Sequence, residues 1–270
     1  MPSPAPESQQ LTPLEAMLAF ATSITSILVL APMLYRTLGL AAMAVTQVVC
    51  IAGPALAIAL AQGRSLRAAA ALLGIRRASA PAWLGAALLG ISFWFVNLVT
   101  VAPIADRYLG GKELVRSLDE SILNTGTPMW VTIVIIAGFP GVCEELLMRG
   151  AVARAFSGRV GTAGAVIASA LLFGLMHLHP AQMLTTAAFG LVLGYTALVS
   201  GSVLPAILVH VMNNAVVLLV AGEISPSATA ALRSHPVGFG IGAGFLSICG
   251  VLVVLLGRQP ERADPRTKPS

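Results

Sequence analysis

Long apolar runs follow one another along almost the whole chain. A helix needs about 20 consecutive, mostly apolar residues to cross the hydrocarbon core of a bilayer. Eight runs approach or exceed this length, and they lie at 14–35, 38–62, 81–104, 129–156, 162–179, 181–200, 203–221 and 237–257. The pattern predicts an all-α fold, a polytopic transmembrane bundle of about eight spanning helices.

The small number of charged side chains excludes a soluble globular protein. Only 10% of the residues are charged and 57% are hydrophobic, whereas soluble domains carry about 25% charged residues. The net charge of +5 does not indicate nucleic-acid binding, because the basic residues lie in short segments between the apolar runs. The three cysteines lie inside apolar runs, and their spacing matches no zinc motif and no disulfide framework.

The apolar runs divide the chain into one membrane domain and two tails. Residues 1–13 lack Lys and Arg, so this N-terminal tail does not have the basic region of a cleaved signal peptide. Residues 14–257 form the expected transmembrane domain, and the charged, Pro-rich residues 258–270 form a C-terminal tail. The Arg-containing segment 63–80 predicts a short helix at the membrane interface. The polar segment 105–128 predicts a solvent-exposed loop with some helix.

The distribution of basic residues predicts the orientation of the bundle. Cytoplasmic loops of membrane proteins carry the excess of Lys and Arg. With the N-terminus in the cytoplasm, eleven of the 16 Lys and Arg residues lie on the cytoplasmic side. We therefore expect both termini in the cytoplasm and, from the overall composition, a bacterial plasma membrane. No internal repeat of the transporter type is present.

Ionisable side chains inside the spans cluster in three segments. Each such group costs a few kcal/mol or more in a bilayer, so each needs a structural or functional reason. The segments are CEELLMR, with Glu144, Glu145 and Arg149; FGLMHLHP, with Phe173, His177 and His179; and HVMNN, with His210, Asn213 and Asn214. Their order along three spans points to one shared site.

The first segment contains two glutamates in different situations. Glu145 and Arg149 are four residues apart, so they share a helix face and can form an ion pair. Glu144 lies about 100° around the helix from Glu145 and does not have this partner. An unpaired carboxylate suits proton-transfer chemistry, although all three groups could also form a purely structural ion network. Pro140, just before the pair, predicts a bend in the helix.

The second and third segments each place two residues one helical turn apart. Phe173 precedes His177 by four residues, and His210 precedes Asn214 by four residues. A lone histidine in a helix is more often a satisfied core residue than a catalyst, but two histidines in a charge-poor bundle shift that balance. His179 lies on a different face, at an expected helix end, where an interfacial or supporting role is expected.

The depths of these residues in the bilayer support a common site. Glu144 and His177 both lie roughly 25 Å from the turn near Val160 that joins their spans. Two antiparallel neighbours would therefore place the two side chains level with each other. His210 and Asn214 lie roughly 12 to 18 Å beyond the turn on the same side, a difference that helix tilt can absorb. One buried polar site is the economical interpretation.

The three segments together resemble a known family. EELLMR, FGLMH and HVMNN follow the patterns EExxxR, FxxxH and HxxxN of the CAAX-protease and bacteriocin-processing family of intramembrane endopeptidases. The resemblance covers roughly residues 125–220, which form the expected protease core, and the first 120 residues carry no motif. Met148 departs from the family pattern, in which Phe is frequent, and this difference is expected to affect packing more than chemistry.

The resemblance implies a role for each matching polar residue. Glu144 corresponds to the general base that activates a water molecule, and His177 helps to hold and orient that water. His210 and Asn214 correspond to the groups that stabilise the oxyanion of the tetrahedral intermediate. The implied reaction is hydrolysis of a peptide bond in a membrane-associated peptide or protein.

The remaining motif residues are expected to support the site. Glu145, Arg149 and Phe173 correspond to structural positions. One carboxylate and two histidines are also a plausible zinc set, but the chain lacks HExxH or any similar short ligand pair, so we expect no metal and no other cofactor. No nucleic-acid partner is expected, and the sequence does not indicate an oligomeric state.

Two other functions are compatible with buried Glu and His residues. One is a proton-coupled transporter, in which such groups form a proton relay. The other is a non-catalytic membrane scaffold or immunity protein. The intact set of three ordered motifs favours the intramembrane endopeptidase over both.

Overall fold

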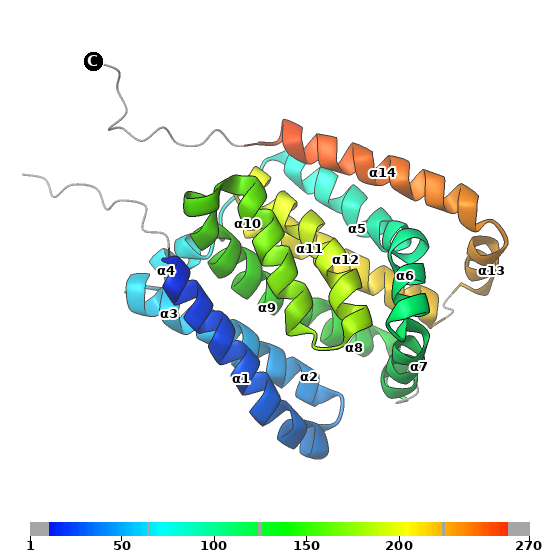
Figure 1. The fold of residues 1–270 in the computed structure, drawn as a ribbon, viewed down its shortest axis with the longest axis horizontal. Helices are drawn as coiled ribbons and strands as arrows, with labels where there is room; N and C mark the ends of the chain where they lie inside the picture. The colour runs from blue at the N-terminus through cyan, green and yellow to red at the C-terminus, as the bar shows by residue number, and fades with distance from the viewer. Residues whose placement is uncertain (1–10, 64, 124–125, 223–224, 259–270) are drawn as a thin grey trace, which may run out of the picture.

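The computed structural model describes residues 11–63, 65–123, 126–222 and 225–258, and every regular element in these ranges is a helix (Figure 1). The elements, with π-helical segments written η, are α1 Pro13–Leu38, α2 Ala41–Thr46, η1 Gln47–Ala52, α3 Gly53–Gly63, α4 Leu66–Leu72, α5 Ala80–Thr100, α6 Ala102–Tyr108, α7 Gly111–Ile122, α8 Met129–Ile133, η3 Val134–Gly138, α9 Phe139–Glu145, η4 Leu146–Ala153, α10 Arg154–Met176, α11 Pro180–Ser200, α12 Val203–Ala221, α13 Pro226–Ser234 and α14 Pro236–Leu256. The predicted all-α, polytopic bundle is confirmed. Most of both predicted tails lies outside the described residues.

Among the described residues, seven helical stretches are long and apolar enough to cross a membrane, compared with the eight predicted. The difference is due to Met129–Met176, whose 48 residues count as one stretch although they would extend about 72 Å as a continuous helix. The backbone leaves the helical region at Gly161, with φ 70° and ψ 172°. Arg149 lies over the ring of Phe173 at 4.4 Å, which requires the chain to reverse between them. This stretch therefore contains both predicted spans.

The C-terminal helix has the surface of a helix that faces lipid. In α14, apolar side chains such as Ile241, Phe245 and Leu256 are more than 60% exposed. The helix packs along α5 (Figure 1) through a contact between two glycines. A Cβ atom on Gly85 would lie 2.6 Å from the carbonyl oxygen of Gly250. Small residues of this kind allow membrane helices to approach closely.

A second close contact joins α10 and α11 beside the polar segments. A Cβ atom on Gly190 would lie 2.9 Å from the Cα atom of Ala170, so only glycine allows this separation of the two helices. The same contact brings the Gly190 carbonyl oxygen within 3.1 Å of Arg149 Nη2. Close helix packing therefore also supplies a hydrogen-bond partner for a buried cation.

The helix that carries the two glutamates is irregular near Pro140, where the sequence predicts a bend. Pro140 lies inside a continuous run of helical backbone, just after η3 passes into α9, and its missing N–H group interrupts the hydrogen-bond ladder there. The chain forms π-helix before and after α9, in η3 and η4. π-helical segments change the direction of the side chains that follow them and are frequent at functional sites.

The two segments predicted to lie outside the spans are both ordered. Within 63–80, the short helix α4 ends at a turn whose Gly74 carbonyl oxygen accepts a hydrogen bond from the first residue of α12. The segment 105–128, predicted to be a solvent-exposed loop with some helix, contains more helix than loop, because it includes the end of α6 and all of α7. Val115 and Ile122 lie two turns apart on α7, and both line the cavity described below, although Val115 is 55% exposed.

Candidate active site

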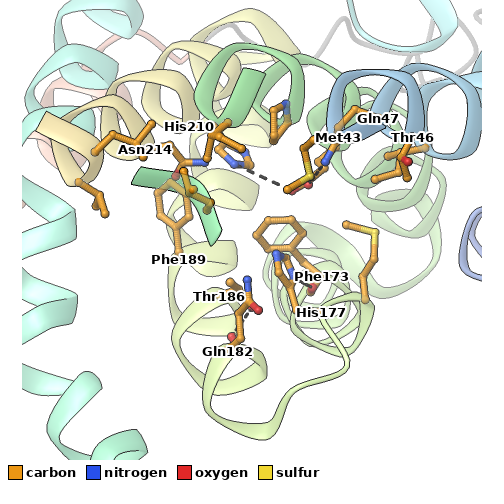
Figure 2. A pocket seen from close by; sticks show the side chains of 18 of the residues that line it. Met43, Thr46, Gln47, Phe173, His177, Gln182, Thr186, Phe189, His210 and Asn214 are labelled. Carbon is orange, nitrogen blue, oxygen red and sulfur yellow. Dashed lines mark hydrogen bonds and ion pairs between the residues drawn. The ribbon is translucent and has the colours of Figure 1, made fainter. Parts of the chain in front are cut away.

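A cavity of about 460 Å³ lies inside the bundle, and helices from both halves of the chain contribute to its wall. Figure 2 shows side chains from α2 and η1, from the end of α10, from α11 and from α12 around the same space. The lining includes five of the residues singled out in the sequence, namely Glu144, Phe173, His177, His210 and Asn214. The fold therefore brings the three polar segments together at one cavity.

Glu144 lies at the wall of this cavity and is 6% exposed. The sequence predicts that Glu144 does not pair with Arg149, and the structure agrees. Glu144 does have another partner, which the sequence did not indicate. Its Oε1 atom accepts a hydrogen bond of 2.7 Å from Nε2 of Gln47. Its Oε2 atom lies 3.9 Å from Nε2 of His210. The two oxygens of this carboxylate thus have different surroundings.

Glu145 lies at the centre of a fully buried ionic network behind the cavity. Its Oε1 atom accepts hydrogen bonds from Nη1 of Arg149 at 3.0 Å and from Nδ1 of His210 at 2.8 Å. The side chains of Glu145 and Arg149 have no exposed surface. The contact between residues four apart that the sequence predicts is present, and His210 extends it to the cavity wall.

Phe173 connects the network to both histidines. Its ring is 1% exposed, and the guanidinium group of Arg149 lies over one face at 4.4 Å from the ring centre. The rings of His177 and His210 approach it edge-on, with centroid distances of 5.1 and 5.9 Å. Phe189 contacts the His210 ring in the same way at 5.4 Å. The orientations of the two imidazoles are therefore fixed by aromatic packing.

The two histidines of FGLMHLHP lie at the junction of α10 and α11. His177 follows the last residue of α10, and its Nδ1 atom donates to the backbone carbonyl oxygen of Phe173 at 2.9 Å. A carbonyl oxygen can only accept, so Nδ1 carries the proton and Nε2 of the neutral ring is an acceptor. His179 precedes α11, at the helix end that the sequence predicts, and does not line the cavity.

The two asparagines of α12 form a pair at the cavity wall. Nδ2 of Asn213 donates to Oδ1 of Asn214 at 3.2 Å. Because its oxygen is engaged, Asn214 presents its NH₂ group as the free part of the amide. Asn213 is 8% exposed and lies behind Asn214, outside the cavity lining.

The N-terminal helices contribute to the cavity wall, which the sequence did not indicate. Tyr35, Met43, Thr46 and Gln47 line the cavity, although they lie in the region without motifs. Gln47 is 5% exposed and contacts Glu144 directly. The available signal was one uncharged amide inside an apolar run, which a search for ionisable groups does not select.

The cavity residues provide no evident cage for a metal ion. Among the described residues, no three His, Cys, Asp or Glu side chains converge in a way that could hold one. Nδ1 of His210 is occupied by Glu145, and Nδ1 of His177 is occupied by a backbone carbonyl. Each imidazole therefore has Nε2 available, which is the single nitrogen that a metal-ligating histidine also offers, and one oxygen of Glu144 already accepts a hydrogen bond from Gln47.

Comparison with known proteins gives a match over the region that forms this site. Residues 126–216 match the family model described as type II CAAX prenyl endopeptidase, Rce1-like. The matched segment contains all three polar motifs. Searches of curated proteins and of solved structures found no match. The apolar helices and the family match together indicate a multi-pass membrane protein in which residues 126–216 are similar to the type II CAAX prenyl endopeptidases.

Proposed function

We propose that this protein hydrolyses a peptide bond in a membrane-associated peptide or protein, with Glu144 as the base that activates water. The proposal rests on the position of Glu144 at the wall of the 460 Å³ cavity. Its Oε1 atom accepts a hydrogen bond from Gln47, and its Oε2 atom lies 3.9 Å from Nε2 of His210. A carboxylate placed in this way has one oxygen free to accept a proton.

The nucleophile in this proposal is a water molecule between Glu144 and His177. Oε2 of Glu144 removes one proton from the water, and Nε2 of His177 accepts a hydrogen bond from the other. The water oxygen then forms a bond to the carbonyl carbon of the substrate, and the π electrons of the carbonyl move to its oxygen. General-base catalysis of this kind contributes about 10²- to 10⁴-fold to a rate.

Asn214 and His210 are proposed to stabilise the resulting oxyanion. The free NH₂ group of Asn214 is a donor that requires no change in protonation. His210 already donates through Nδ1 to Glu145, so it can donate through Nε2 only as an imidazolium ion. That state would balance the buried charges, with Arg149 and His210 positive and the two glutamates negative. One oxyanion donor is worth about 3 kcal/mol in other proteases.

Collapse of the intermediate completes the reaction. The oxyanion re-forms the carbonyl double bond, and the carbon–nitrogen bond breaks. The proton held by Glu144 moves to the departing nitrogen, so that one water and one peptide bond yield a carboxylic acid and an amine. Glu145, Arg149 and Phe173 take no part in these steps and hold His210 and His177 in place.

The lining of the cavity suits a substrate with apolar side chains close to the bond that is cut. Apart from the polar residues described above, the wall is mainly aliphatic, with Ile27, Ile51, Val115, Ile122, Ile136 and Val217 among its members. The name of the matched family refers to prenylated CAAX substrates. For this chain we propose the broader class of membrane-associated peptides, cut in a bacterial plasma membrane by an enzyme with both termini in the cytoplasm and without a metal.

The test compares cells of the source organism that express the wild type or Glu144→Gln. Mass spectrometry of membrane fractions measures new peptide termini that appear with the wild type. We expect these termini to fall at least about 100-fold in the variant, while its yield and melting temperature after detergent extraction stay unchanged. An identical set of termini in both strains would overturn the proposal.

A further inference from the structure

The second membrane span brings an uncharged amide to the proposed catalytic glutamate. Gln47 lies 97 positions before Glu144 in the sequence, in the π-helical segment η1. Its Nε2 atom donates to Glu144 Oε1 at 2.7 Å, and its side chain is buried. Figure 2 shows Gln47 across the cavity from Phe173 and His177. Gln47 itself lies outside the segment that matches the family, whereas Glu144 lies inside it.

The surroundings of Gln47 are poorly suited to an amide placed there for stability alone. Its Oε1 atom is buried and has no hydrogen-bond partner among the described residues. A buried polar atom without a partner destabilises the folded state. A side chain of similar length without polar atoms, such as Met, would fill the same space without this cost. The favourable contact that accompanies the burial is the hydrogen bond to Glu144.

We propose that Gln47 is a positioning residue that determines which oxygen of Glu144 acts as the base. The hydrogen bond holds Oε1 and leaves Oε2, which lies 3.9 Å from Nε2 of His210, as the oxygen that accepts the water proton. The inference rests on the proposed function, because it assigns Gln47 a role only through Glu144. It extends the site to a helix outside the matched region.

A purely structural role for Gln47 predicts a different result. If the amide served to join η1 to α9, its removal would lower the stability of the bundle and reduce activity only through loss of folded protein. A positioning role predicts loss of activity at unchanged stability, because water from the cavity can replace the amide as the hydrogen-bond donor to Glu144. The melting temperature therefore separates the two explanations.

The first variant is Gln47→Met, with Gln62→Met as its matched control. Gln62 lies in the same span and also donates to a glutamate, Glu15, but at an exposed position away from the cavity. We expect Gln47→Met to lower the yield of the peptide termini that the wild type produces about 10- to 100-fold, without lowering the melting temperature. Gln62→Met should remain within about twofold of the wild type.

The second variant, Gln47→Glu, tests the hydrogen bond through the pH dependence of activity. Two carboxyl groups this close share one proton, and the protonated Glu side chain can donate to Glu144 as the amide does. When pH rises and this proton leaves, the donor is lost and the two anions repel each other. Titratable or charged groups near this pair are Tyr35, Cys143, Glu145, Arg149, His177 and His210. All of them are also present in the wild type.

The measurement uses isolated membranes from each strain, incubated from mildly acidic to mildly alkaline pH, with termini quantified by mass spectrometry. We expect the activity of Gln47→Glu relative to the wild type to be highest at the acidic end and to fall as pH rises. Wild-type activity in Gln47→Met, or a constant ratio for Gln47→Glu, would overturn the inference. Full activity in Glu144→Gln would overturn the proposed function instead, so the two failures are distinguishable.

Discussion

Nδ1 of His210 donates a 2.8 Å hydrogen bond to Oε1 of Glu145, the same oxygen that binds Arg149. One carboxylate oxygen therefore connects a buried cation to an imidazole at the cavity wall. Glu145 and Glu144 are adjacent in the sequence but have separate tasks in this arrangement. Glu145 organises the interior of the bundle, and Glu144 faces the cavity.

Replacement of Glu145 by Ala should destabilise the fold. The change leaves Arg149 without its ionic partner, and removing one member of a buried ion pair costs about 3 to 5 kcal/mol. We expect a low yield of monodisperse protein after detergent extraction and a clearly lower melting temperature. Glu144→Gln, measured alongside, should retain wild-type yield. Equal stability of both variants would contradict the division of roles between the two glutamates.

Changes at the asparagine pair should reduce activity by different amounts. Asn214→Asp replaces the NH₂ donor with an acceptor, and loss of an oxyanion donor lowers rates about 10²- to 10³-fold. Asn213→Ala removes only the bond that holds the oxygen of Asn214, so the amide can rotate and activity should fall about 10-fold. Both effects are measured as the yield of the peptide termini that the wild type produces. An Asn213→Ala effect as large as that of Asn214→Asp would assign Asn213 a direct role.

A methyl group at Gly190 should separate α10 from α11. Its Cβ atom would lie 2.9 Å from the Cα atom of Ala170, and overpacking of this kind costs about 1 to 3 kcal/mol. Gly194→Ala is the matched control one turn further along α11, because its nearest contacts would be at 3.4 Å. Thermal unfolding in detergent should show a lower melting temperature for Gly190→Ala only. Similar values for both variants would argue against close packing at Gly190.

Chelation should leave the activity unchanged. Catalytic zinc sites use three protein ligands. In the proposed mechanism, Nε2 of His177 instead binds the water molecule and Nε2 of His210 instead binds the oxyanion. We expect membranes treated with EDTA or 1,10-phenanthroline to retain the wild-type termini, and the purified protein to contain substoichiometric zinc. Loss of activity on chelation, with recovery on addition of zinc, would show a metal-dependent mechanism.

Features that depend on local spacing could be predicted from the sequence. The apolar runs indicate membrane helices because a helix satisfies its backbone polar groups within the segment, as the interior of a bilayer requires. The contact between Glu145 and Arg149 follows from the helical period alone. The meeting of Glu144, His177 and His210 at one cavity was inferred by adding helix rise and turn positions, since these spans are consecutive or nearly so.

Features that depend on distant helices could not be predicted in this way. Gln47 reaches Glu144 because α1, η1 and α9 pack together, and its residue type carries no charge that would draw attention inside a membrane span. The polar composition of 105–128 predicts a loop with some helix, and it does not indicate that Gly111–Ile122 forms a continuous helix. The π-helical segments depend on packing around Pro140, which local patterns describe only as an interruption.

The reversal at Gly161 has a consequence for how the site is assembled. Glu144 lies on one arm of a helical hairpin and His177 directly follows the other arm, so adjacent arms of one stretch of chain bring both to the cavity. The proposed base and its water-orienting partner thus reach their relative positions through contacts within the hairpin. Of the next two helices, α12 carries both proposed oxyanion donors, His210 and Asn214.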